Sequence, residues 1–122
     1  MKLLIPALAA MLALTGSAAA QQLLESYQAR LGVDDHYNSN GAQLTDPAAI
    51  IRQDRANFHE FGIRDPEDEG DRFFAVKANR ARLEAMLRAG RMDRFTRNAI
   101  RRGTPLVLVE IYRNFVVVTA AR

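Results

Sequence analysis

The stretch PLVLVEIYRNFVVVTAA, residues 105–121, is apolar and β-branched apart from a polar break at Arg113 and Asn114. Side chains alternate between the two faces of a strand, so a two-residue turn at this break brings apolar residues opposite one another. The facing pairs all lie on one side: Ile111 with Val116, Val109 with Val118 and Val107 with Ala120. The stretch therefore predicts a C-terminal antiparallel β-hairpin that is buried on one face.

The opposite face of this hairpin is only half apolar, with Glu110, Tyr112, Phe115 and Val117. Two strands alone are marginally stable in water, so other elements must pack on the buried face. The segments before the hairpin have helical patterns. The sequence therefore predicts a small α+β domain, mainly α-helical with about four helices, that ends in the hairpin.

Four helices are predicted from apolar spacing and from residues that begin and end helices, over residues 22–31, 47–61, 73–89 and 93–102. The second is the best marked, because Asp46 can cap it, Pro47 takes its first position and Gly62 ends it. For the third helix, we expect Asp71 to be the cap and Gly90 to be the end.

The first twenty residues, MKLLIPALAAMLALTGSAAA, have the layout of a secretory signal peptide. Lys2 precedes an apolar run, and Ala18 and Ala20 provide the small side chains that signal peptidase requires. The alternative is an uncleaved membrane anchor, which needs an apolar run of about 20 residues, longer than this one. We therefore expect cleavage after Ala20, a periplasmic or secreted protein, and a single globular domain over residues 21–122 with no transmembrane segment.

The sequence contains no cysteine, which excludes disulfides and thiolate metal sites. Small secreted domains often depend on disulfides, so this one must be stabilised by packing or by a partner. An exported chain without cysteine fits a bacterial periplasm better than a eukaryotic secretory route.

The two halves of the predicted domain carry opposite charge. Residues 21–71 have 4 cations and 11 acids, a net charge of −7, whereas residues 72–122 have 12 cations and 3 acids, a net charge of +9. Two interpretations stay open: the halves neutralise one another in the fold, or the basic half binds an anionic partner.

The stretch RDPEDEGD, residues 64–71, places five carboxylates in seven positions. A calcium loop of the EF-hand type needs a closing Glu at its twelfth position, where counting from Asp65 gives Val76. We interpret the stretch as a solvated connection whose last acids favour the N-terminus of the next helix. The alternatives are a surface that docks on the protein's own arginine-rich half and an irregular calcium site.

Two charged residues occupy helix positions where apolar side chains are expected. Asp54 lies on the apolar stripe of the 47–61 helix, and Arg80 lies on the stripe of the 73–89 helix. We expect either an Asp54–Arg80 ion pair between these helices, or two side chains that reach solvent at the edges of the stripes.

Few residues are suited to catalysis or metal binding. The two histidines, His36 and His59, form a possible metal site with Asp34 and Asp35 if the loop around His36 folds over the helix. No nucleophile motif, phosphate loop or dinucleotide fingerprint is present, and no cofactor is expected. A metal-dependent protein or hydrolase-like enzyme centred on the His36 loop and His59 is the alternative function.

The arginine-rich segment carries the leading functional prediction. Its order of helix, turn, helix and hairpin is similar to that of a winged helix-turn-helix, but no residue motif supports this likeness, and an exported protein does not meet the genome. We therefore expect no nucleic-acid partner. The predicted contacts to an anionic envelope component or an acidic protein are Arg94, Arg97, Arg101 and Arg102.

Overall fold

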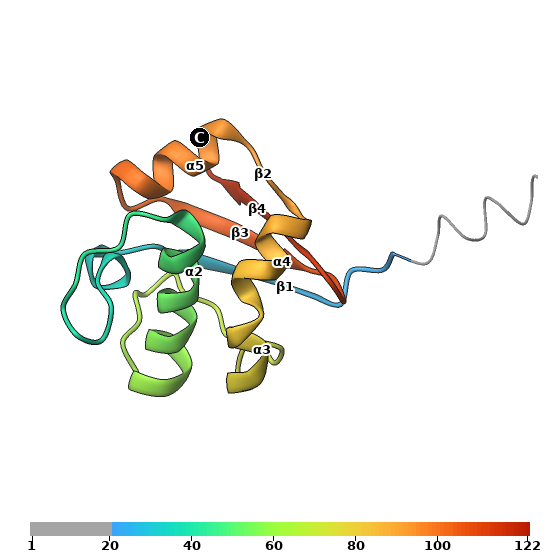
Figure 1. Ribbon diagram of the computed structural model, residues 1–122, viewed down its shortest axis with the longest axis horizontal. Coiled ribbons are helices and arrows are strands. Elements are labelled where there is room, and N and C mark those ends of the chain that lie inside the picture. The colour runs from blue at the N-terminus through green and yellow to red at the C-terminus, as the bar shows by residue number, and fades with distance from the viewer. Residues whose placement is uncertain (1–20) are drawn as a thin grey trace, which may run out of the picture.

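The computed structural model describes residues 21–122, whose strands form one four-stranded sheet (Figure 1). The strands are β1 (Glu25–Arg30), β2 (Arg91–Met92), β3 (Leu106–Ile111) and β4 (Val116–Ala120). Their order across the sheet is β1-β3-β4-β2, with β1–β3 and β3–β4 antiparallel and the short β2 parallel to β4. The fold is mixed α+β, as predicted. The predicted signal peptide lies outside the described residues.

The C-terminal strands β3 and β4 lie side by side in the predicted register. The facing pairs are Ile111 with Val116, Val109 with Val118 and Val107 with Ala120, and all six side chains are buried. These strands do not form a separate hairpin, because β1 pairs with the other edge of β3 and β2 with the other edge of β4. The prediction of a mainly helical domain with a terminal hairpin is therefore correct only in part.

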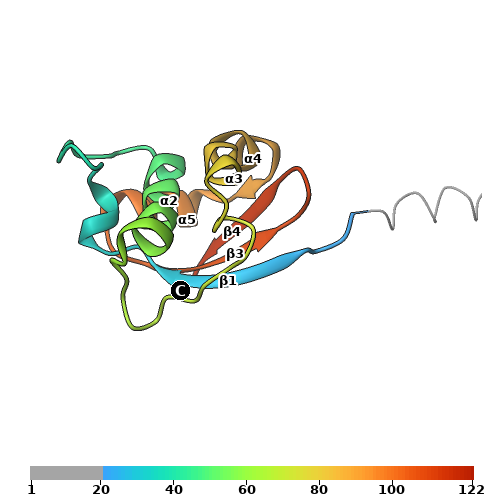
Figure 2. The same cartoon turned by 90° about the horizontal axis from the view of Figure 1, so that it is seen from below.

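The helices are α2 (Pro47–Ala56), α3 (Lys77–Ala81), α4 (Leu83–Ala89) and α5 (Arg94–Arg102). Figure 2 shows α2, α3 and α4 on one side of the sheet. The N–H of Ala48 donates to Asp46 Oδ1 at 3.1 Å, and the N–H of Thr96 donates to Asp93 Oδ1 at 2.8 Å. Such caps satisfy N–H groups that have no partner within the helix, so the predicted starts of α2 and α5 are confirmed.

The helix predicted over residues 22–31 is wrong, because this segment contains β1. The spacing of its leucines suits a helix, but Tyr27, Ala29 and Leu31 also alternate and are buried on one face. Tyr27 lies opposite Val109 and Ala29 lies opposite Val107 on β3. A short apolar segment can form either a helix or a strand. This one forms a strand because it pairs with an edge of β3 that would otherwise have no partner.

The helix predicted over 47–61 changes its winding after Ala56 and ends in a π-helical turn, Asn57–Phe61. In this turn Asn57 is buried, whereas Phe61, an apolar residue, is 51% exposed. Gly62 ends the helix with a positive φ of 68°, as C-terminal glycines commonly do.

The helix predicted over 73–89 is split and starts later than expected. Residues 72–76 form turns, in which Phe74 N–H donates to Asp71 Oδ2 at 2.6 Å. Asp71 therefore caps a turn before α3 rather than the helix itself, and Val76 is 53% exposed at the start of α3. Arg82 separates α3 from α4.

The apolar core lies between the helices and one face of the sheet. It includes Ile50 and Ile51 of α2, Leu83 and Met86 of α4, and Ile100 of α5. On the opposite face of the sheet Leu108 is 42% exposed, and Figure 2 shows no described helix on that side. Among residues 21–122, no helix has both the length and the apolar character needed to span a membrane.

The acidic stretch runs along the outer edge of β1. Its carboxylates accept from backbone N–H groups of that strand: Gln28 N–H donates to Glu69 Oε1 and Arg30 N–H donates to Asp68 Oδ1, both at 2.7 Å. Glu69 N–H donates to the Gln28 carbonyl at 2.8 Å, and Arg30 pairs with Glu67 at 2.6 Å. An exposed sheet edge is prone to pair with other chains, so this stretch protects β1.

Candidate anion-binding face

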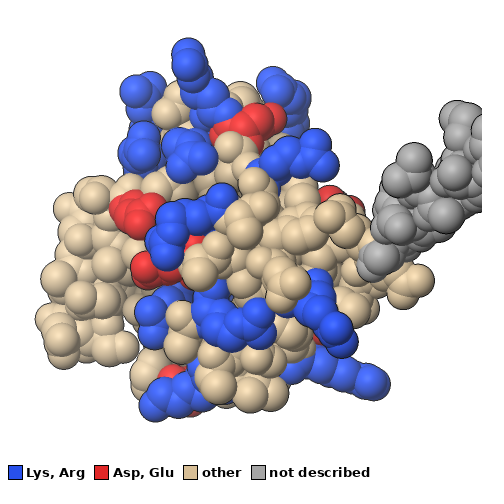
Figure 3. Space-filling model, turned by 45° about the vertical axis from the view of Figure 1, so that its right-hand side comes forward, with Lys and Arg blue, Asp and Glu red and all other residues tan. Residues whose placement is uncertain are grey.

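The four predicted arginines, Arg94, Arg97, Arg101 and Arg102, all lie on α5 and are exposed. Figure 3 shows Lys and Arg side chains gathered at the top of the molecule, where Figure 1 places α5 and β2. We call α5's four arginines, with Arg88 and Arg91 just before them, the basic face. None of these six forms an ion pair with a residue in the described part of the chain.

The two oppositely charged halves do not neutralise one another. Within residues 21–122, the ion pairs that join the halves are Arg52–Glu84 at 4.0 Å and Arg80–Glu60 at 3.2 Å. The remaining pairs lie within the acidic half. Other carboxylates of that half, such as Asp68 and Glu69, accept from backbone N–H groups. Within residues 21–122, no arginine of the basic face therefore lies within ion-pair distance of a carboxylate.

The largest pocket described has a volume of about 700 Å³ and lies within this face. Three of its lining residues are Arg88 at the end of α4, Arg91 on β2 and Arg97 on α5, and Asp46 is its one acid. The rest of the lining is Ala48, Leu87, Gly90 and Met92. Sequence reasoning missed Arg88 and Arg91, although the regular spacing of residues 88, 91, 94 and 97 is a signal for them.

A smaller pocket of about 220 Å³ contains Arg101 and Arg102 together with His36. Both ring nitrogens of His36 face carbonyl oxygens, Nδ1 that of Gly32 at 2.7 Å and Nε2 that of Ile100 at 2.8 Å. Carbonyl oxygens only accept, so a ring nitrogen that carries a proton donates to the carbonyl it faces. His36 thus ties the C-terminal turn of α5 to the loop after β1.

A buried cluster of charged residues lies under the acidic stretch, with Arg55 at its centre. Arg55 Nε donates to Asp54 Oδ2 at 2.9 Å, and Nη1 donates to Asp71 Oδ1 at 2.9 Å. The guanidinium also lies 3.8 Å from the centre of the Tyr27 ring and 4.7 Å from that of Phe58. The side chains of Arg55 and Asp71 are 0% exposed, so this cluster is suited to stabilising the fold and not to meeting a ligand.

The predicted Asp54–Arg80 ion pair is not formed. Both side chains are buried, as their stripe positions indicated, but Asp54 pairs with Arg55 and Arg80 pairs with Glu60. Arg80 Nη1 also donates to the carbonyl of Phe74 at 2.8 Å. Arg80 thus pairs with an acid of the segment predicted as the 47–61 helix, but its partner is Glu60 in the π-helical turn and not Asp54.

The alternative metal set Asp34, Asp35, His36 and His59 is not brought together. His36 bonds backbone carbonyls, whereas His59 Nε2 lies 2.8 Å from Asp71 Oδ1. In the described part of the chain, no group of three or more histidines and acids is placed to hold a metal ion.

Asp35 and Asp54 form a buried carboxyl pair. Burial raises the pKa of Asp35, while hydrogen bonds from Asn57 at 2.9 Å and from Gly32 at 2.9 Å oppose the rise. Burial also raises the pKa of Asp54 well above its ordinary value; Arg55 opposes this and the charge of Asp35 adds to it. The negative charge of Asp35 disfavours ionisation of Asp54, and burial disfavours ionisation of both carboxyls.

This pair should make the protein less stable as pH rises. A folded-state pKa above the unfolded value, about 4, contributes stability that is complete below pH 4 and is lost as pH rises through the folded pKa. Relative to Asp35→Asn, the wild type should therefore lose unfolding free energy between about pH 4 and neutral pH, by about 1.4 kcal/mol per unit of pKa shift. Urea unfolding across this range measures the difference, with the exposed Asp34→Asn as control. A constant difference between wild type and Asp35→Asn would contradict the raised pKa of Asp35.

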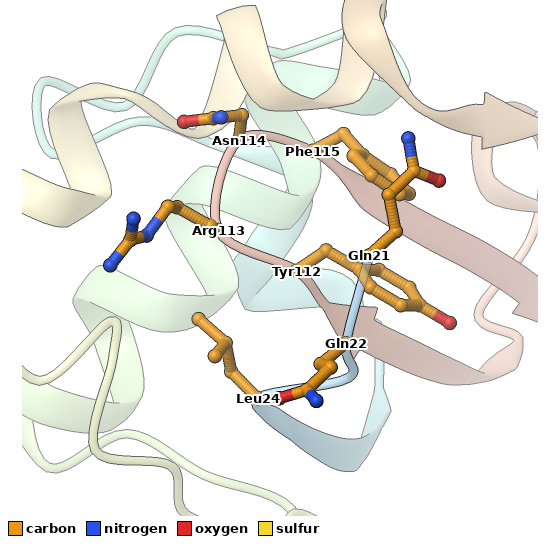
Figure 4. Close-up of a pocket in the computed structure, with 7 residues that line it drawn as sticks. All are labelled: Gln21, Gln22, Leu24, Tyr112, Arg113, Asn114 and Phe115. Atoms are coloured by element: carbon orange, nitrogen blue, oxygen red, sulfur yellow. The ribbon is translucent and has the colours of Figure 1, made fainter. Parts of the chain in front are cut away.

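Two further pockets lie away from the basic face. One, of about 380 Å³, lies beside the β3–β4 turn and contains Gln21 and Gln22. Figure 4 shows them near Tyr112 and Phe115, whose rings stack 4.5 Å apart. The other, of about 460 Å³, includes Asn57 and the exposed Phe61. Neither gathers a set of like charges.

Comparisons with protein-family models, curated proteins and solved structures found no match. The geometry and charge of the site are therefore the grounds for the functional interpretation.

Proposed function

We propose that this protein is an exported binding protein whose basic face recognises an anionic, phosphate-bearing component of the cell envelope. The observation that carries this proposal is the absence, within residues 21–122, of acidic partners for the six arginines of that face. The predicted signal peptide would direct export of the protein. An exported protein meets the anionic groups of the cell envelope, to which the arginines can bind.

The arginines of the basic face are suited to recognising phosphate groups specifically, in addition to attracting negative charge. The guanidinium group is planar, stays charged at all physiological pH values and can donate two parallel hydrogen bonds to one phosphate. Because these exposed arginines have no ion pair to break within the described residues, binding a phosphate costs them little interaction energy.

Binding to lipid vesicles tests this proposal. The protein should co-sediment with vesicles that contain phosphatidylglycerol and not with neutral phosphatidylcholine vesicles. Each arginine close to an anionic surface contributes about 1 kcal/mol, so replacing four of them should weaken binding by about 1,000-fold. The variant replaces Arg94, Arg97, Arg101 and Arg102 by glutamine.

A control variant with the same loss of charge separates the basic face from net charge. It replaces exposed cations elsewhere on the chain, namely Arg52, Arg72, Lys77 and Arg113. This control should bind vesicles more tightly than the α5 variant. Equal losses would show that only total charge matters, and salt-sensitive binding to polyglutamate without vesicle binding would indicate an acidic protein partner instead.

A further inference from the structure

We propose that the pocket between α4, β2 and α5 is a specific site for a phosphate ester, held by Arg88, Arg91 and Arg97. This inference rests on the proposed function and names the chemical group that the basic face would recognise. It also moves the centre of recognition away from Arg94, Arg101 and Arg102, which do not line this pocket.

The pocket holds three guanidinium groups and one carboxylate, so its charge favours an anion. Among the described residues, the three guanidiniums make one hydrogen bond, a long one from Arg97 Nη2 to the Met92 carbonyl at 3.4 Å. Asp46 is already engaged, because its Oδ1 accepts from the N–H of Ala48. Most of the arginine N–H groups are therefore free to bind a ligand.

The shape and lining of the pocket favour an ester over free phosphate. A volume of about 700 Å³ lies within the range of about 300–1,000 Å³ that is typical of small-molecule sites. Ala48, Leu87 and Met92 add apolar surface beside the arginines. A phosphate group bonded to a carbon skeleton matches both parts of this lining.

Rigid elements hold the arginines of the pocket. Arg88 lies in the last turn of α4, Arg91 lies on β2 and Arg97 lies on α5. Gly90 lets this segment approach the sheet closely, because a Cβ at this position would overlap the carbonyl oxygen of Val116. Sites built on regular elements keep their geometry better than sites on loops.

The test measures binding of glycerol 3-phosphate to the purified protein by the backbone amide NMR signals of residues 88–97. Saturable shifts are expected there. Replacing Arg88 and Arg91 by glutamine should weaken binding by about 100-fold, since each hydrogen bond to a charged group contributes about a factor of ten or more. The control replaces Arg52 and Arg113, which are exposed and lie outside the basic face; it removes the same charge and should leave the affinity unchanged.

A competition experiment with phosphatidylglycerol vesicles distinguishes a lipid headgroup from a free ester. If glycerol 3-phosphate displaces the vesicles, the pocket takes the headgroup. If glycerol 3-phosphate binds but vesicles do not, the pocket is confirmed with a free ester as ligand, and the envelope function fails. If vesicles bind through the arginines while residues 88–97 do not respond to glycerol 3-phosphate, the pocket assignment is overturned and the proposed function stands. Equal losses in the two double variants would also overturn it.

Discussion

Replacing Arg55 by methionine is expected to lower the free energy of unfolding by about 3–5 kcal/mol, because Asp54 and Asp71 would remain buried without their cation. Domains of this size have a total stability of about 5–15 kcal/mol. The substitution would therefore remove a large share of it. Urea unfolding followed by circular dichroism measures the change.

The matched control for this substitution is Arg52→Met on the same helix. The side chain of Arg52 is exposed and lies 4.0 Å from Glu84, so its loss should cost less than about 1 kcal/mol. Adding Asp71→Asn to Arg55→Met should recover part of the lost stability, since one stranded charge disappears. An Arg55→Met protein as stable as the Arg52→Met protein would show that the buried cluster does not hold α2 to the acidic stretch.

Replacing Gly90 by alanine is expected to cost about 1–3 kcal/mol or more, because the new Cβ would overlap the backbone of β4 at Val116. A backbone carbonyl cannot rotate away as a flexible side chain can, so β2 must move away from β4. Arg91 lies on β2, and binding of glycerol 3-phosphate should weaken together with stability.

Gly103→Ala is the control for this substitution. A Cβ at Gly103 would lie 3.6 Å from the carbonyl oxygen of Ala99, an ordinary contact. Thermal unfolding should therefore separate the two variants clearly. If the Gly90→Ala and Gly103→Ala proteins unfold at the same temperature and Gly90→Ala binds glycerol 3-phosphate with wild-type affinity, the close approach of β2 to β4 does not position the pocket.

The parts of the fold that local patterns predicted correctly are those where one signal dominates. Alternation around Arg113 and Asn114 set the register of β3 and β4. A cap and a proline marked the start of α2. These signals act over a few residues and do not depend on what packs against them.

The errors arose where distant partners decide the structure. The segment before Leu31 became β1 because the edge of β3 was open to it, which no local pattern shows. Arg55 was not singled out, although it lies four residues after the buried Ile51. Its carboxylate partner Asp71 is sixteen residues away and its ring partner Tyr27 lies on another element.

The candidate site was predicted in part. The location of the predicted arginines on an exposed helix follows from the sequence of α5. The lack of acidic partners for these arginines cannot be read from the sequence. It arises because the acidic stretch forms hydrogen bonds with the backbone of β1 and with Arg55 instead. The pocket formed with Arg88 and Arg91 also needed the position of β2, a strand of two residues with no sequence signal.

The most direct test of the central claim is the salt dependence of binding to phosphatidylglycerol vesicles. If the unpaired arginines of the basic face bind an anionic surface, the affinity of the wild type should fall steeply as salt is raised, because salt screens charge interactions at exposed sites. The variant lacking Arg94, Arg97, Arg101 and Arg102 should bind weakly at every salt concentration. Wild-type affinity that does not change with salt, or equal affinity of wild type and variant, would contradict the claim.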